Sequence, residues 1–137
     1  MGKLVLVSLV ALAGCSALTS TSSGPGTAPA GGGETVTVVL SNFSFDPDHI
    51  RLRAGEPVRL QLVNESDGGH NFSAPAFFAG SSFPPGSSAP VGGEMEVGSR
   101  QTVEIALVPR KPGTYPLKCT HSLHALFGMT GAIEVTP

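Results

Sequence analysis

The pattern that most restricts the fold of this chain is a series of short runs in which apolar and polar side chains alternate. Such runs occupy residues 50–53 (IRLR), 58–63 (VRLQLV) and 101–108 (QTVEIALV). A period of two places the apolar side chains of an extended strand on one face. Turn residues separate the runs, as in the DPD sequence at 46–48. The pattern predicts half-buried β-strands joined by tight turns.

Glycine and proline are abundant, with 18 and 12 residues in a chain of 137. This composition favours turns over long helices. The spacing of the runs predicts about seven to eight short strands, beginning at residues 35–40 and ending at residues 131–136. We therefore expect an all-β fold, an antiparallel Greek-key β-sandwich or barrel, as a single domain at residues 34–137.

Residues 73–99 break this periodicity with four prolines and five glycines between residues 75 and 98. We expect a long surface excursion with little regular structure. Its phenylalanines, Phe77, Phe78 and Phe83, are candidates to hold it against the barrel. Met95 is interpreted as a packing residue, and His49 as a solvated surface histidine.

The N-terminal region carries export signals. Lys3 precedes an apolar run at residues 4–13 that is too short to span a bilayer, which predicts a secretion signal at residues 1–14. The run ends in LAGC, which resembles the bacterial lipobox and implies lipidation of Cys15. The alternative is an ordinary signal peptide with a chance cysteine. Residues 15–33 are almost all Ser, Thr, Gly, Ala and Pro, so we expect a flexible linker.

These features predict a protein exported and lipid-anchored to the bacterial cell envelope, with its domain facing the periplasm or the exterior. The charge of the chain makes nucleic acid a poor partner. The net charge is −2, and Arg110 and Lys111 form the one adjacent basic pair. A surface that tracks phosphates needs a larger basic cluster. We expect no nucleic-acid partner.

The stretch with most chemical information is residues 119–129, CTHSLHALFGM. A single thiol in an exported protein is exposed to oxidation, so Cys119 needs a reason. Gaps of four residues separate Cys119 from His124 and His124 from Met129, which lets one loop present three donors to one centre. His70, in the run GGHNF, is the other histidine in a suitable loop and the candidate fourth donor.

Several roles are open for Cys119. A buried structural cysteine is common, but that role leaves the nearby histidines and methionine unexplained. A cysteine nucleophile with a histidine base is less attractive, because no acyl-transfer motif is present and an exported thiolate would need a reductant. Zinc accepts thiolate and imidazole but does not usually recruit a thioether. Two imidazoles, a thiolate and a weak axial methionine are the ligands of a blue-copper site, so copper fits best.

Residues 34–137 are similar to the cupredoxins of the plastocyanin and azurin family. The similarity is specific at the GHN sequence of residues 69–71 and at Cys119, His124, the GM sequence of residues 128–129 and Gly131, and looser elsewhere. It implies one type 1 copper ion.

The resemblance also implies a role for each matching residue. His70, Cys119 and His124 would be the equatorial ligands and Met129 the axial one. Three further residues, Asn71, Thr120 and Gly69, would support these ligands. Asn71 would hydrogen-bond toward the loop of residues 119–129, with Thr120 as its partner. The carbonyl of Gly69 would lie opposite Met129.

One residue departs from the family pattern. His121 follows Cys119 by two residues, a spacing that would strain a chelate ring. We therefore expect His124 to be the ligand and His121 to lie outside the ligand set. If His121 binds instead, the site is not an ordinary blue one.

The resulting functional prediction is a membrane-tethered electron carrier, not an enzyme. The resemblance implies that redox partners dock on an apolar patch beside His124 that includes Leu126 and Phe127. The alternative is a copper-tolerance lipoprotein that sequesters or delivers Cu(I), for which His121 would be an additional donor. A copper enzyme is a third possibility, weakened because no second metal cluster is visible in the sequence.

Overall fold

The computed structural model describes residues 2 and 33–137. The predicted signal peptide, most of the linker and the candidate lipidation site Cys15 lie outside the described residues. The elements are β1 (Glu34–Ser41), β2 (Ser44–Asp46), β3 (His49–Arg53), β4 (Val58–Asn64), β5 (His70–Ser73), α1 (Pro75–Ala79), β6 (Ser81–Ser82), the 3₁₀ helix η1 (Val91–Gly93), β7 (Glu94–Val97), β8 (Thr102–Pro109), β9 (Gly113–Lys118) and β10 (Thr130–Thr136).

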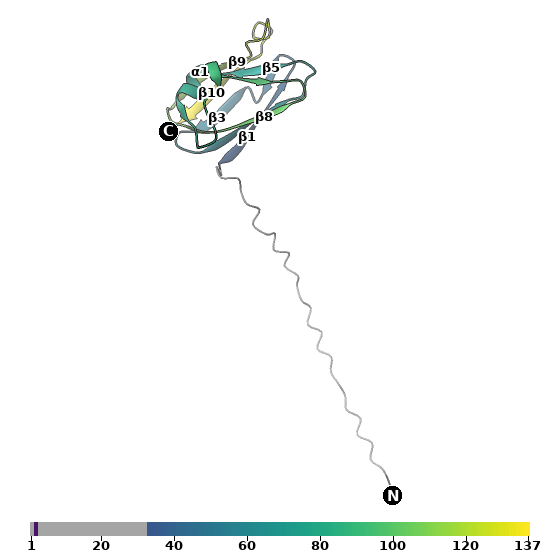
Figure 1. Ribbon diagram of the computed structural model, residues 1–137, viewed down its shortest axis with the longest axis vertical. Helices are drawn as coiled ribbons and strands as arrows, with labels where there is room; N and C mark the ends of the chain where they lie inside the picture. The colour runs from purple at the N-terminus through teal and green to yellow at the C-terminus, as the bar shows by residue number, and fades with distance from the viewer. Residues whose placement is uncertain (1, 3–32) are drawn as a thin grey trace.

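The strands form two five-stranded sheets that face each other (Figure 1). One sheet has the order β2-β1-β4-β8-β6, and the other has the order β3-β10-β9-β5-β7. The all-β sandwich is therefore confirmed. Residues 33–137 hold ten strands instead of seven or eight, because β2 has three residues and β6 has two, too few to show an alternating pattern.

Both sheets contain parallel as well as antiparallel pairs of strands, whereas the sequence predicted an antiparallel sandwich. β1 pairs with β4 in parallel, and β3 pairs with β10 in parallel. The cause is a change of sheet, since β2 pairs with β1 in one sheet while β3 belongs to the other. The chain then returns to place β4 beside β1 in the same direction. The remaining pairs of strands are antiparallel.

The core lies between the sheets and follows from the alternation. β4 shows it most clearly, since its buried residues Val58, Leu60 and Leu62 alternate with half-buried neighbours. Cys119 and Met129 belong to the same buried cluster as these side chains. The candidate copper ligands therefore sit at one end of the apolar core, not on a separate lobe.

Residues 73–99 contain more regular structure than expected. They hold α1, β6, η1 and β7, so the prediction of little regular structure is wrong there. Phe77 and Phe78 are buried, and Met95 packs in the core from β7. Gly93 holds this segment close to α1, because a Cβ at Gly93 would lie 2.4 Å from Pro75 Cα, and its φ is +71°.

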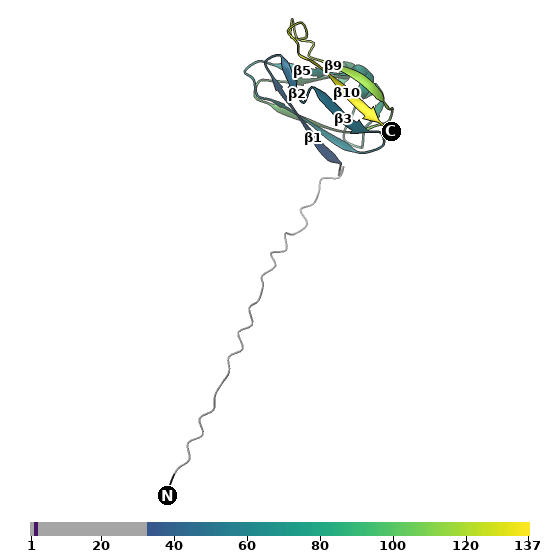
Figure 2. The same cartoon turned by 180° about the vertical axis from the view of Figure 1, so that it is seen from behind.

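The two ends of the sandwich carry different parts of the chain. The loop between β9 and β10 protrudes from one end, whereas β1 begins at the other end, as the two opposite views show (Figures 1 and 2). Over residues 33–137 and residue 2, no helix has the length and apolar character needed to cross a bilayer.

Candidate metal centre

The loop of residues 119–129, here called the ligand loop, is closed by its own backbone. The N–H of Cys119 donates to the carbonyl of Met129 at 3.0 Å, and the N–H of Met129 donates to the carbonyl of His124 at 3.0 Å. Gly128 has a φ of +101°, in a region that side chains disfavour. These features bring the loop's potential ligands into one compact turn at the ends of β9 and β10.

Three donor atoms meet at this end of the sandwich. His70, Cys119 and His124 each direct one potential ligand atom into a group whose members lie within 4.8 Å of one another. Nδ1 of His70 lies 3.1 Å from Nδ1 of His124, which in turn lies 3.4 Å from Sγ of Cys119. His70 comes from β5. In the second sheet, β9 lies between β5 and β10. Residues 54 positions apart thus share one centre.

Burial differs within the group. His70 is 1% exposed and Cys119 is fully buried, whereas His124 is half-buried. Burial lowers the pKa of His70, and the neighbouring charges of His124 and then His121 lower it further. The lowered pKa favours the neutral form of the His70 ring, in which one ring nitrogen has a free lone pair for a metal.

Met129 is tied by its backbone to two of the three donor residues. It is fully buried in the core, and its backbone bonds to both Cys119 and His124. A thiolate, two imidazoles and a thioether form a donor set that suits copper better than zinc. Ligand atoms at bond lengths of about 2.0–2.3 Å from one ion lie about 3.3–4 Å apart, so the donors are close to the spacing that an ion needs. The residues fit the expected copper ion.

Asn71 ties β5 to the start of the ligand loop. Its Nδ2 donates to Thr120 Oγ1 at 2.6 Å, and its Oδ1 accepts from the Thr120 N–H at 2.8 Å. Asn71 is 1% exposed, whereas Thr120 is exposed, so the two bonds lie at the edge of the buried region. The pair fixes the segment beside Cys119 to the strand that carries His70.

His121 is not a member of the donor group. Its Nε2 lies 2.9 Å from Oε2 of Glu96 on β7, and Glu96 also accepts from Nδ2 of Asn71 at 3.0 Å. Gly69 lies beside this ring, since a Cβ at Gly69 would stand 3.6 Å from Cε1 of His121. Sequence reasoning did not find Glu96, because its partners depend on the pairing of β5 with β7.

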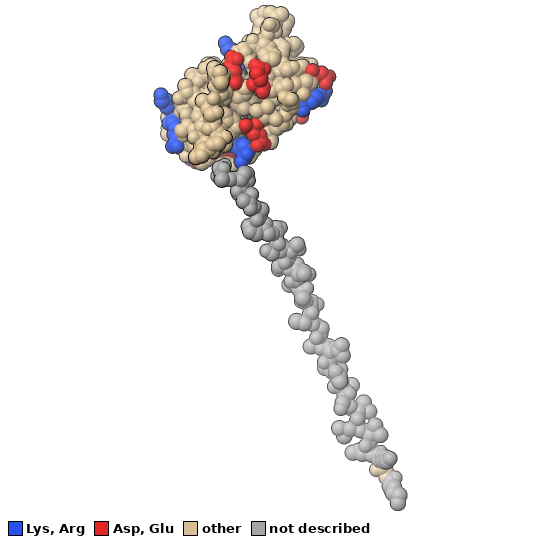
Figure 3. Space-filling model, in the orientation of Figure 1, with Lys and Arg blue, Asp and Glu red and all other residues tan. Residues whose placement is uncertain are grey.

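The surface around His124 is apolar. Leu123, Leu126 and Phe127 are exposed at 60%, 79% and 61%, and Phe43 at 42%. The Phe43 ring meets the His124 ring edge-on, with centroids 5.2 Å apart. In Figure 3 the protruding tip of the domain carries no charged side chain, and acidic groups lie below it. Phe43, in the turn between β1 and β2, extends the predicted patch.

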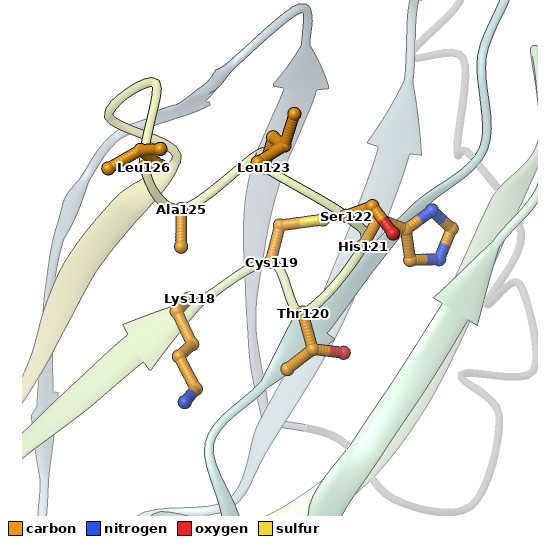
Figure 4. Close-up of a pocket in the computed structure, with 8 residues that line it drawn as sticks. All are labelled: Lys118, Cys119, Thr120, His121, Ser122, Leu123, Ala125 and Leu126. Atoms are coloured by element: carbon orange, nitrogen blue, oxygen red, sulfur yellow. The ribbon is translucent and has the colours of Figure 1, made fainter.

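A hollow of about 320 Å³ lies against the outer side of the ligand loop. It is lined by Lys118, Cys119, Thr120, His121, Ser122, Leu123, Ala125 and Leu126 (Figure 4). In this view the side chains of Lys118 and Thr120 project to one side of the chain, and the sulfur of Cys119 projects to the other. The alternation directs the thiol inward, to where His124 Nδ1 lies.

Comparisons with known proteins point to one fold family. The model of the cupredoxin-like domain matches residues 5–133. Auracyanin B is similar in structure, with 25% identity, a TM-score of 0.58, and coverage of 76% of this chain and 89% of auracyanin B. A search of curated protein sequences finds no match.

Two further solved structures share the fold at lower identity. Dithionite-reduced auracyanin from the photosynthetic bacterium Roseiflexus castenholzii has 21% identity and a TM-score of 0.59, with coverage of 78% of this chain and 100% of that one. The McoA multicopper oxidase of the hyperthermophile Aquifex aeolicus has 15% identity and a TM-score of 0.60, with coverage of 77% and 30%. The chain thus corresponds to less than a third of the oxidase.

Proposed function

This chain belongs to the cupredoxin-like domain family, and on that premise we propose that it is a type 1 copper protein that carries single electrons between redox partners in the cell envelope. The observation that carries the proposal is the convergence of His70, Cys119 and His124 beside the buried Met129. The similarity to auracyanin B supports the same conclusion.

In this proposal, His70, Cys119 and His124 would hold the copper ion, with Met129 as a fourth, weaker ligand. The bound ion supplies a Cu(II)/Cu(I) couple. The chain contributes a rigid frame, because Cys119 and His70 are buried and the ligand loop is bonded to itself. A frame that changes little between the two oxidation states keeps the structural cost of electron transfer low.

The proposed route for the electron passes through the half-buried ring of His124. Leu126 and Phe127, in the same loop as His124, are exposed apolar side chains. A partner with an apolar surface would exclude water where it contacts them. Residues 119–129 include no Lys, Arg, Asp or Glu that would have to be desolvated on docking. We therefore place the docking face of redox partners at the ligand loop.

The proposed anchor is lipid on Cys15. Two or three acyl chains bind a bilayer firmly, whereas a single chain binds marginally. β1 begins at the end of the sandwich opposite the ligand loop, which supports an arrangement with the copper site facing away from the anchored end (Figure 2). Mass spectrometry of the membrane fraction tests the anchor, since a Cys15→Ser variant should lose both the lipid mass and membrane retention.

The test of the central proposal is the absorption spectrum of the full-length protein after loading with Cu(II). We expect an intense blue or green band that bleaches reversibly on reduction and is absent from Cys119→Ser. Ser122→Ala, in the same loop but outside the donor group, should keep the band. A protein that binds Cu(I) without any thiolate-to-copper band would instead support copper sequestration or delivery.

One contact argues against copper sequestration or delivery. His121, the candidate additional donor, is paired with Glu96. Substrate oxidation by the purified protein would favour the enzyme alternative over a carrier.

A further inference from the structure

We propose that Ser66 and Asn64 form a hydroxyl–amide relay that sets the tautomer of His70, so that Nδ1 is the atom offered to copper. The inference rests on the proposed copper site and adds two positioning residues to it. Both precede His70 in the chain, Asn64 as the last residue of β4 and Ser66 in the following loop.

The relay begins at the nitrogen of His70 that does not face the other donors. Nε2 of His70 lies 2.9 Å from Oγ of Ser66, whereas Nδ1 faces His124. The three residues are sealed from solvent, with exposures of 1% for His70, 6% for Ser66 and 2% for Asn64. In such an environment each polar atom depends on its protein partner, so the direction of each hydrogen bond matters.

The direction is fixed at Asn64. Its Nδ2 lies 2.8 Å from the carbonyl oxygen of Gly68, 3.0 Å from that of Val97 and 3.0 Å from that of Gly98. Carbonyl oxygens only accept, so the amide nitrogen must face them. Oδ1 of Asn64 then faces Ser66, where it accepts from the Ser66 N–H at 2.9 Å.

The hydroxyl of Ser66 has one proton to donate. Both Oδ1 of Asn64, at 2.8 Å, and the carbonyl of Gly68, at 3.0 Å, are acceptors. If the hydroxyl donated to His70 instead, its oxygen would face these two acceptors with no proton between them. The proton therefore goes to an acceptor, and the Ser66 oxygen accepts from Nε2–H of His70.

The tautomer of His70 follows. A neutral imidazole carries one proton, and the relay holds it on Nε2, so Nδ1 presents its lone pair to the donor group. A hydrogen bond from the outer nitrogen also fixes the ring plane and raises the basicity of the metal-binding nitrogen. Asn64 also donates to the carbonyls of Val97 in β7 and Gly98 in the turn after it, so these hydrogen bonds fix its position relative to β7.

The test compares Ser66→Ala with Ser66→Thr, which restores a hydroxyl, in the full-length protein. Ser73→Ala is the matched control, because Ser73 is equally buried on β5 but donates to Glu94 and not to a histidine. We expect Ser66→Ala to lose about 10- to 100-fold in copper affinity and to show a higher reduction potential, with recovery in Ser66→Thr. Equal values in Ser66→Ala and Ser73→Ala would overturn the relay.

Nitrogen NMR of His70 in the unmutated Cu(I) protein provides a reading that needs no variant to fold. The relay requires a proton on Nε2 and none on Nδ1, and the opposite tautomer contradicts it. The same measurement on the metal-free protein identifies the tautomer of His70 in the absence of copper. A protein that binds no copper yet keeps Nε2 protonated would therefore contradict the proposed function while supporting the relay.

Discussion

Asn71 and Thr120 are joined by two hydrogen bonds that run in opposite directions, one from the Asn71 amide to the Thr120 hydroxyl and one from the Thr120 N–H to the Asn71 oxygen. The first residue follows one candidate copper ligand, and the second follows another. The pair therefore links two chain segments that are distant in sequence and adjacent at the site.

Replacement of Asn71 should destabilise the fold. Asn71→Ala removes both bonds to Thr120 and a side chain that is 1% exposed, which should cost about 1–3 kcal/mol. Urea unfolding of the metal-free protein measures the loss. Thr37→Ala removes an exposed bond to Gln61 and should change stability by less than about 0.5 kcal/mol. A cost for Asn71→Ala no larger than that of Thr37→Ala would mean that the pair is not a structural tie.

The two histidines of the ligand loop should behave differently. His124→Ala removes a member of the donor group and should abolish the blue band. His121→Ala removes a contact with Glu96 between side chains that are 34% and 66% exposed, so the band should remain and the stability should change by less than about 1 kcal/mol. The absorption spectra of the two copper-loaded variants decide the matter. If His121→Ala loses the band while His124→Ala keeps it, the assignment of ligands is wrong.

Met129→Leu should keep copper bound. The two side chains have similar volumes, and Met129 is fully buried, so the substitution should cost less than about 1.5 kcal/mol. If the Met129 thioether binds the ion, its loss should change the colour and the reduction potential. Spectra and voltammetry of the copper-loaded variant measure both. An unchanged potential would show that Met129 does not touch the metal.

Gly131→Ala should disturb the end of the ligand loop. A Cβ at Gly131 would lie 2.3 Å from the carbonyl oxygen of Asp48, which accepts a hydrogen bond from the Ala132 N–H. Relief of this overlap should cost about 1–3 kcal/mol. Thermal unfolding of the variant tests it against Gly68→Ala, where a Cβ meets nothing within 4 Å. Equal melting temperatures would contradict the close approach.

Leu126→Lys should slow electron exchange between Cu(I) and Cu(II) copies of the protein without altering the spectrum. A charge at an exposed apolar contact raises the cost of approach through the His124 face, and we expect a rate lower by about tenfold. Line broadening in NMR measures the exchange rate. Val91→Lys is the control, because Val91 is 96% exposed but lies in η1, outside the ligand loop. Equal rates in both variants would place the exchange face elsewhere.

Local pattern was enough to predict the strands that alternate and the closeness of Cys119 and His124 within one loop. The run at residues 58–63 became β4 with its apolar residues buried, and Cys119, His124 and Met129 lie in one turn of chain. The reason is that strand periodicity and loop spacing are properties of neighbouring residues.

Features that depend on pairing between distant strands escaped prediction. The parallel alignment of β1 with β4 follows from a change of sheet that no local pattern encodes. Glu96 reaches His121 because β7 lies beside β5. The contact of Ser66 with His70 depends on the course of a polar loop whose sequence resembles that of many surface turns.

The inclusion of Cys119 and Met129 in the hydrophobic core has a consequence for the lifetime of the protein. A metal that binds only the folded chain stabilises it by mass action, and two of the candidate ligands come together only when the core that contains them is formed. Copper supply would thus govern how much of the folded population survives proteolysis, independently of any electron that the protein carries.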